Sequence, residues 1–350
     1  MNEKPGLQAQ GKEASVRQLT RVTVLMVDAT YASPALGPLD IFHSAGRLWN
    51  GFHGLPHMPC FDVQLASTDR HQLDCVGALG ITPHVNLLDI TDTDLILVPT
   101  VNLHDQPVDP RIVQWLRERH EAGSAIAGIC AGVAYLAEAG LLDKRVATTH
   151  WAIAEQMRQR FPEVQWHPER FVTEDSGIFC SGGVYAAMDL SLFLVEKYAG
   201  REVALQCAKS LLLAMPRRHQ SSYSVPLLTR PHADAEIRDT EDYLRVNFGK
   251  PLTADMLAAR VHVSPRSFLR RFKAATGQLP GAYLQALRIS AAKELLENGA
   301  ASIQRVGMQA GYQDVAHFRQ IFKRHTGLTP GEYREQFGTG NVLVGDAHPL

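Results

Sequence analysis

The most constraining feature of this chain is an internal repeat in its last third. At an offset of 50 residues, eight pairs of positions carry the same residue type. The pairs are Phe268 and Phe318, Phe272 and Phe322, Lys273 and Lys323, Thr276 and Thr326, Gly277 and Gly327, Pro280 and Pro330, Gly281 and Gly331, and Tyr283 and Tyr333. Eight identities in so short a window indicate that one structural unit is used twice.

Each copy of the repeat has the pattern of a helix-turn-helix motif. A short amphipathic segment, 254–260 or 303–310, precedes a tight turn and a second helical segment. Ser264-Pro265 opens that second helix in the first copy and Gln313-Asp314 opens it in the second, and both are good helix-capping sequences. Strand patterns are absent after about residue 234, so we predict an all-α domain with two helix-turn-helix motifs.

The second helix of each copy has one apolar and one basic face. The paired phenylalanines lie four residues apart and share the buried face. The opposite faces carry Arg266, Arg270, Arg271 and Lys273 in the first copy and His317, Arg319, Gln320, Lys323 and Arg324 in the second. Such helices can enter a DNA major groove, where side-chain forks bond base edges and neighbouring cations contact phosphates. A helical domain for protein contacts is the alternative.

One helix is expected between the two copies. The segment 281–298 would be about 27 Å long at 1.5 Å per residue. That length places the two basic helices near one turn of DNA apart, roughly 34 Å, so that they would read adjacent grooves on one face.

Charge separates the two ends of the chain. The net charge of -1 combines 22 Lys and Arg against 29 Asp and Glu in residues 1–249 with 13 against 7 in residues 250–350. These counts give about -7 and +6, a basic carboxy-terminal region on an acidic body. A polyanion partner for the basic region and a merely solvated surface both fit the charge alone.

The first two thirds alternate between strand and helix patterns. The continuous apolar runs typical of buried parallel strands are 21–27, 61–66, 94–99 and 125–129. Helical patterns fall at 110–122, 131–141, 186–199 and 202–215, and a helix start is expected at Gly37-Pro38. This succession predicts an α/β domain with a parallel, flavodoxin-like sheet covered on both faces.

Length and composition define the rest of the organisation. We predict a tail at 1–18, an α/β domain at 19–215, a linker at 216–233, a DNA-binding domain at 234–338 and a tail at 339–350. No segment has the pattern of a membrane span or a signal peptide, so we expect a cytoplasmic protein without membrane contact. The five cysteines lack paired short spacings, so we expect neither a disulfide framework nor a metal site.

One cysteine has the setting of a nucleophile elbow. Cys130 lies between Gly128 and Gly132, after a buried strand and before a helix. The glycines permit a strained turn, and a helix amino terminus would lower the pKa of the thiol. We expect His150 and Trp151, which follow another short strand, and Ser181 to converge with Cys130 at the carboxyl ends of the strands. Packed structural roles for these four residues are the alternative.

Residues 235–337 resemble the DNA-binding domain of AraC-type transcription regulators. The resemblance rests on Leu257-Ala258, the segments 264–268 and 310–314, and above all on the closing segment 327–334. It implies double-stranded operator DNA as the partner, with possible contact to RNA polymerase. The matching base or backbone contacts are Arg266, Leu269, Arg270, His317, Arg319 and Gln320, with Lys273, Lys323 and Arg324 beside them. Gln320 departs from the arginine often found at its position.

The amino-terminal part resembles the class I glutamine amidotransferase-like fold of the PfpI type. The order of Gly37-Pro38, Cys130, the segment 139–142 and the segment 181–183 is similar to the GlxA-type regulators, in which this fold precedes an AraC-type module. The resemblance implies a homodimer, a small-molecule effector and no cofactor. Nitrogenous effectors, such as amino acids or quaternary amines, are common among such relatives, and Trp49 or Trp151 could face a cation.

The resemblance argues against catalysis. In hydrolytic relatives an acidic residue approaches the cysteine from the segment before the first helix, and Pro34 occupies that position here. His167 and Glu169 follow Cys130 too closely to match the His-x-Glu of true amidotransferases. We therefore predict an effector pocket and no catalytic residues. The alternatives are a cysteine-dependent hydrolase or amidase with an appended DNA-binding module, and a redox sensor that uses Cys130.

Overall fold

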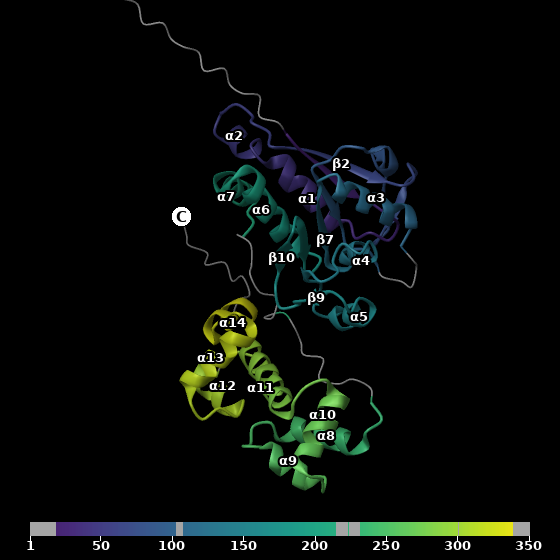
Figure 1. Cartoon of the computed structure of the whole chain (residues 1–350). Coiled ribbons are helices and arrows are strands. Elements are labelled where there is room, and N and C mark those ends of the chain that lie inside the picture. The colour runs from purple at the N-terminus through teal and green to yellow at the C-terminus, as the bar shows by residue number, and fades with distance from the viewer. Residues whose placement is uncertain (1–18, 103–107, 215–222, 224–231, 300, 339–350) are drawn as a thin grey trace, which may run out of the picture. The chain divides into compact units, whose positions relative to one another are not determined.

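The structure is a computed structural model that describes residues 19–102, 108–214, 223, 232–299 and 301–338. The predicted tails, 1–18 and 339–350, and most of the predicted linker, 216–233, lie outside the described residues. The described chain forms two compact units (Figure 1). The second unit contains His150–Arg160, Trp166–Phe171 and the described residues from Tyr223 onward. The predicted domain boundaries stay predictions.

The first unit is built on a seven-stranded sheet with the order β10-β11-β7-β6-β1-β2-β5. All neighbours are parallel except β10 and β11, which are antiparallel. Its strands are β1 (Thr20–Leu25), β2 (Phe61–Ser67), β5 (Val85–Asn86), β6 (Leu95–Val98), β7 (Ala125–Ile129), β10 (Val172–Asp175) and β11 (Ile178–Ser181). The core order β2-β1-β6-β7-β11 is the flavodoxin-like order, which confirms the predicted fold class.

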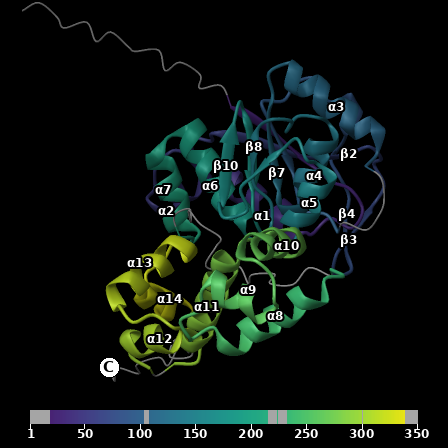
Figure 2. The same ribbon diagram turned by 60° about the horizontal axis from the view of Figure 1, so that its bottom comes forward.

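Helices cover both faces of this sheet because its central strands are apolar on both sides. Helices α1 and α6 pack together on one face, with α7 and α2 outside them, and α3 and α4 lie on the other face (Figures 1 and 2). Their bounds are α1 (Ser33–Ser44), α2 (Leu48–Phe52), α3 (Pro110–Glu121), α4 (Val133–Glu138), α6 (Ala186–Ala199) and α7 (Arg201–Ser210).

The predicted start of α1 at Gly37 was wrong by about one turn. The helix begins at Ser33, with Pro34 in its first turn, so Gly37 and Pro38 lie inside it. A Cβ on Gly37 would collide with the side chain of Met188 on α6. The glycine therefore marks close packing of two helices and not a helix start.

Short elements complete the described structure. They are the strand pairs β3 (Leu73–Cys75) with β4 (Leu79–Ile81) and β8 (Val146–Ala147) with β9 (Gln165–Trp166), helix α5 (Ala154–Arg160), and the single 3₁₀ turns η1 (Leu87–Asp89) and η2 (Cys130–Gly132). The predicted helix 131–141 is shorter than expected, because the chain first makes the 3₁₀ turn at Cys130 and enters α4 only at Val133.

From Ala235 onward the described chain is helical, as the sequence predicts. Its helices are α8 (Ala235–Asn247), α9 (Ala254–Arg260), α10 (Pro265–Thr276), α11 (Pro280–Glu297), α12 (Ile303–Gln309), α13 (Val315–Thr326) and α14 (Pro330–Phe337). Helix α11 lies between the group α8–α10 and the group α12–α14 (Figure 2). Its amino-terminal half, with Tyr283 and Leu287, packs into one core, and its carboxy-terminal half, with Ile289 and Leu296, packs into the other.

Candidate functional site

The repeat produces two nearly identical aromatic cores in the helical region. In the first, the rings of Phe272 and Tyr283 are 5.4 Å apart at an interplanar angle of 86°. In the second, the rings of Phe322 and Tyr333 are 5.4 Å apart at 85°. Both phenylalanines are fully buried. The repeated residues therefore form the same packed scaffold twice, with α10 and α13 in equivalent positions.

The ends of α10 and α13 are also equivalent. Gly277 follows α10 with a φ of 77°, and Gly327 follows α13 with a φ of 79°, the left-handed conformation that ends a helix. The hydroxyl of Thr276 donates to the Phe272 carbonyl over 2.8 Å, and that of Thr326 donates to the Phe322 carbonyl over the same distance. These contacts explain why threonine and glycine are repeated.

The predicted DNA-contacting residues of α10 lie on its solvent side. Arg266, Arg270 and Lys273 are exposed and Leu269 is half-buried. Within the ranges that the structure describes, none of the three cations forms an ion pair. Their charges are thus available to an external polyanion, although their role as DNA contacts stays a prediction.

Arg271 differs from its neighbours on α10. Its guanidinium pairs with Asp234, at 2.7 Å, and with Glu236, at 2.6 Å, which belong to the start of α8. The hydrogen bond from Arg271 holds the pKa of the Asp234 carboxyl below its usual range. Arg271 thus stabilises α10 against α8, and the interpretation that it belongs to the DNA-reading face is corrected.

Helix α13 presents a similar exposed set. The predicted residues His317, Arg319, Gln320, Lys323 and Arg324 are all exposed, and no ion pair of these side chains occurs in the described part of the chain. The capping side chain of Asp314 accepts a hydrogen bond from the backbone N–H of Ala316 and so fixes the start of the helix.

Cys130 adopts the expected strained turn. It has a φ of 54° and is 6% exposed. A Cβ on Gly132 would collide with the backbone oxygens of Val98 and Pro99, so only glycine permits this close approach to β6. The Thr149 hydroxyl donates to the Cys130 carbonyl over 2.9 Å, and the Thr100 hydroxyl donates to the Ile129 carbonyl over 3.0 Å.

The predicted lowering of the Cys130 pKa was wrong. Burial raises the pKa of the thiol, although hydrogen bonding by Thr100 and by the Ala131 backbone lowers it. The loss of hydration on burial is the largest of these contributions, so the two hydrogen bonds do not offset it. The thiol is therefore protonated at neutral pH, which disfavours nucleophilic attack.

Ser181 lies beside the elbow, since it stands opposite Ile129 in the parallel register of β11 and β7. Its hydroxyl oxygen is buried and has no hydrogen-bond partner among the described residues. Buried hydroxyls normally have a hydrogen-bond partner, so a ligand at the carboxyl end of this strand could bond to the Ser181 hydroxyl.

His150 and Trp151 belong to the second compact unit, whereas Cys130 and Ser181 belong to the first. The rings of His150 and Trp151 are 5.3 Å apart. The backbone N–H of Ala152 donates to the His150 Nδ1 over 3.1 Å, and burial lowers the pKa of His150, which favours the neutral ring. The predicted convergence of all four residues stays a prediction.

Other candidate residues have local explanations. His167 pairs with Glu169 over 2.8 Å on the surface. Lys209 lies 5.8 Å from the centre of the Trp49 ring, so this ring already has a cation of the chain. Sequence reasoning missed Thr100 and Thr149, because a threonine after a strand gives no signal that its hydroxyl will bond to a neighbouring turn.

The described residues contain neither a metal-binding cluster nor a membrane-spanning helix. No group of three or more His, Cys, Asp or Glu side chains in these residues is arranged to hold a metal ion. None of the described helices combines the length and the apolar character needed to span a bilayer.

Comparison with known proteins identifies both parts of the chain. A model of the DJ-1/PfpI family matches residues 21–197, and a model of a helix-turn-helix domain matches residues 257–336. The first match includes His150–Arg160, although internal contacts group this segment with the second unit.

Three curated relatives are transcriptional regulators. The HTH-type transcriptional regulator ArgR of Pseudomonas aeruginosa is 30% identical over 67% of this chain and 72% of its own length. CdhR of the same organism is 28% identical over 82% and 84%, and GlxA of Rhizobium meliloti is 29% identical over 64% and 69%. Fold and relatives together define a DNA-binding transcription regulator. The chain belongs to the DJ-1/PfpI family, in the group of AraC-type helix-turn-helix regulators that includes GlxA.

Proposed function

We propose that this regulator reads a two-part operator with α10 and α13. The proposal rests on one observation: two helices on the same aromatic scaffold each present exposed cationic side chains away from that core, and α13 adds the amide of Gln320. Arg266, Leu269 and Arg270 would contact the first half-site, and His317, Arg319 and Gln320 the second. Lys273, Lys323 and Arg324 would neutralise phosphates beside them.

Selection from random double-stranded DNA with the full chain tests this proposal. We expect an enriched sequence with two half-sites, and discrete genomic occupancy at matching sites in the source cell. The matched variants are Arg270→Ala on α10 and Arg201→Ala on α7, where Arg201 pairs with Glu196 on the surface of the first unit. Loss of the motif for both variants, or for neither, would contradict the assignment.

We also propose that the first unit binds a small effector at the carboxyl ends of β7 and β11. In open parallel sheets, ligands bind outside these strand ends. The buried Ser181 hydroxyl, which has no hydrogen-bond partner in the described part of the chain, lies next to the Cys130 turn and supports this location.

Thermal unfolding in the presence of a panel of amino acids and quaternary amines tests the pocket. At least one compound should raise the unfolding temperature of the wild-type chain, because a ligand that binds only the folded state stabilises it. Ser181→Ala should abolish that shift without changing operator affinity. The pocket assignment fails if Ser181→Ala leaves the ligand shift intact.

We propose that the DJ-1/PfpI part is not an enzyme. The raised pKa of the Cys130 thiol supports a non-catalytic role, as does the naming of the relatives as regulators. At pH 7, iodoacetamide should label Cys130 more than tenfold more slowly than a free cysteine, since only the thiolate reacts. Labelling at the rate of a free thiol would contradict this proposal and favour the hydrolase or the redox sensor. An operator affinity that changes with peroxide would then identify the redox sensor.

Assembly and location complete the proposal. We propose a homodimer formed through the amino-terminal part, contact with RNA polymerase at regulated promoters, and a cytoplasmic location. Sedimentation of the full chain would give a mass near 77 kDa, twice the 38.6 kDa of the chain, for the dimer. A single species of 38.6 kDa at micromolar concentration would contradict it.

A further inference from the structure

The loop before the first helix-turn-helix motif meets the turn of the second motif through backbone atoms. Gly311, in the turn between α12 and α13, has a φ of 86°. A Cβ at this position would lie 3.0 Å from the Cα and from the carbonyl oxygen of Gly249, which belongs to the loop between α8 and α9. The loop between α8 and α9 therefore approaches the turn of the second motif so closely that a side chain at Gly311 would crowd it.

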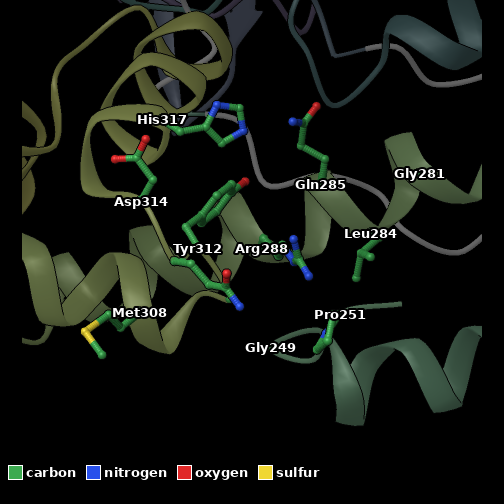
Figure 3. Close-up of a pocket in the computed structure, with 12 residues that line it drawn as sticks. Gly249, Pro251, Gly281, Leu284, Gln285, Arg288, Met308, Tyr312, Asp314 and His317 are labelled. Atoms are coloured by element: carbon green, nitrogen blue, oxygen red, sulfur yellow. The ribbon is translucent and has the colours of Figure 1, made fainter. Parts of the chain in front are cut away.

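One side chain connects the α8–α9 loop to the second motif at this junction. Arg288 lies on α11, and its Nε and Nη2 donate 2.8 Å hydrogen bonds to the carbonyl oxygens of Phe248 and Lys250. Its guanidinium also lies 5.6 Å from the centre of the Tyr312 ring in the second motif. Figure 3 shows Arg288 between Tyr312 on one side and Gly249 and Pro251 on the other.

The chemistry of the junction suits a rigid connection. The planar guanidinium of Arg288 donates to two carbonyls of the α8–α9 loop at once. A lysine has a single ammonium group and cannot reproduce this forked geometry. Tyr312 is 6% exposed, so the contact between the cation and its ring is largely shielded from water. The hydrogen bonds fix Arg288 to the loop that leads into the first motif, and the ring contact fixes the second motif to Arg288.

We propose that Arg288 is a positioning residue that sets the separation of α10 and α13, and thereby the spacing between the two operator half-sites that the protein accepts. This inference rests on the proposed two-part operator. It assigns no base contact to Arg288. A rigid pair of readers binds both half-sites at a high effective concentration only when their spacing matches, so loosening the junction costs affinity and relaxes spacing together.

The test compares DNA selected by the wild-type full chain and by Arg288→Met. The wild type should enrich two half-sites at one spacing. Arg288→Met should enrich the same half-sites spread over several spacings, and its affinity for the wild-type operator should fall about tenfold. Enrichment of the single wild-type spacing with unchanged affinity would overturn the inference. If the wild type selects no paired motif, the proposed function fails instead.

Matched variants separate positioning from folding. Gly311→Ala should relax the spacing, because its new Cβ meets Gly249 and Arg288, whereas Gly249→Ala should not, because its Cβ meets only the Gln309 carbonyl at an ordinary 3.5 Å. Arg288→Lys should give an intermediate spread. These alanine and lysine variants decide the question if Arg288→Met does not fold, and equal behaviour of both alanine variants would reject the junction as the determinant.

Discussion

The two halves of the helical region, α8–α10 with the first part of α11 and α12–α14 with its second part, have cores of the same geometry but different surfaces. At positions related by the 50-residue offset, Phe272 and Phe322 pack on tyrosines in the same geometry. On the outer face, however, Arg270 corresponds to Gln320, and the neighbouring Arg271, which pairs with α8, corresponds to the buried Ile321. The buried residues that hold α10 and α13 in place are therefore the same in the two halves, whereas the exposed residues of these two helices differ. Arginine favours guanine and glutamine favours adenine, so the two halves should read different bases.

The largest predicted effects test the shared core. Phe272→Ala and Phe322→Ala should each reduce the free energy of unfolding by about 3–5 kcal/mol, because each removes a fully buried ring and leaves a cavity. Calorimetry of the full chain, following the transition of the helical region, measures both losses. Losses that differ by more than about 2 kcal/mol would show that the two cores are unequal despite their matching geometry.

The next prediction contrasts adjacent residues on α10. Arg270→Ala should weaken operator binding by about 1–3 kcal/mol without lowering the unfolding temperature, because the side chain is exposed and lies on the predicted reading face. Arg271→Ala should lower the unfolding temperature instead, because it leaves Asp234 and Glu236 without their partner. Fluorescence anisotropy with labelled operator DNA and thermal unfolding of both variants give the two readouts. If Arg271→Ala weakens binding as much as Arg270→Ala at unchanged stability, Arg271 returns to the reading face.

The contrast also shows what the sequence can predict. The helical periodicity, the caps at Ser264 and Asp314 and the phenylalanine spacing predicted the helices and their buried faces, since these are local properties of the chain. The main partner of Arg271 could not be predicted in this way, because Asp234 lies 37 residues away in the sequence.

In the amino-terminal part, local rules again predicted the strand, turn and helix around Cys130. They predicted the wrong direction for the pKa of its thiol, because that pKa depends on how much water the rest of the fold removes. The contacts of Arg288 could not be predicted from the sequence, because they depend on how the α8–α9 loop and the α12–α13 turn meet beside α11.

The stability of the first half of the helical region should depend on pH through the ion pair of Asp234 with Arg271, which has no equivalent at Ile321 in the second half. Hydrogen bonding from Arg271 lowers the pKa of Asp234 in the folded state. The resulting stabilisation is fully present above the unfolded pKa of roughly 3.9 and is lost as the pH falls through the lower folded value. Asp234→Asn keeps an amide oxygen that can cap α8 but removes the charge. Its unfolding temperature should therefore lie below that of the wild type at pH 6 and approach it below pH 4. A constant difference over this range would exclude the ion pair as the cause.

The smallest predicted effect concerns a cap that only the second half has. Thr329 caps α14 by accepting from the Glu332 backbone N–H, and the Glu332 side chain accepts from the Thr329 backbone N–H. The equivalent residue before α11 is Leu279, which is 50% exposed and makes no side-chain cap. Thr329→Ala should therefore lower the free energy of unfolding by about 1 kcal/mol, and Leu279→Thr should raise it by about 0.5–1 kcal/mol.

Leu279 already has the extended backbone of a capping residue, with φ of -77° and ψ of 150°, so the new hydroxyl needs no backbone change to reach the free N–H groups of α11. Urea unfolding of the two single variants and of the double variant measures both effects, and the double variant should be close to the wild type because the two sites lie in separate helix starts. A destabilised Leu279→Thr would mean that Leu279 contributes apolar contacts worth more than a cap. In that case apolar packing would stabilise the start of α11, whereas hydrogen bonds stabilise the start of α14.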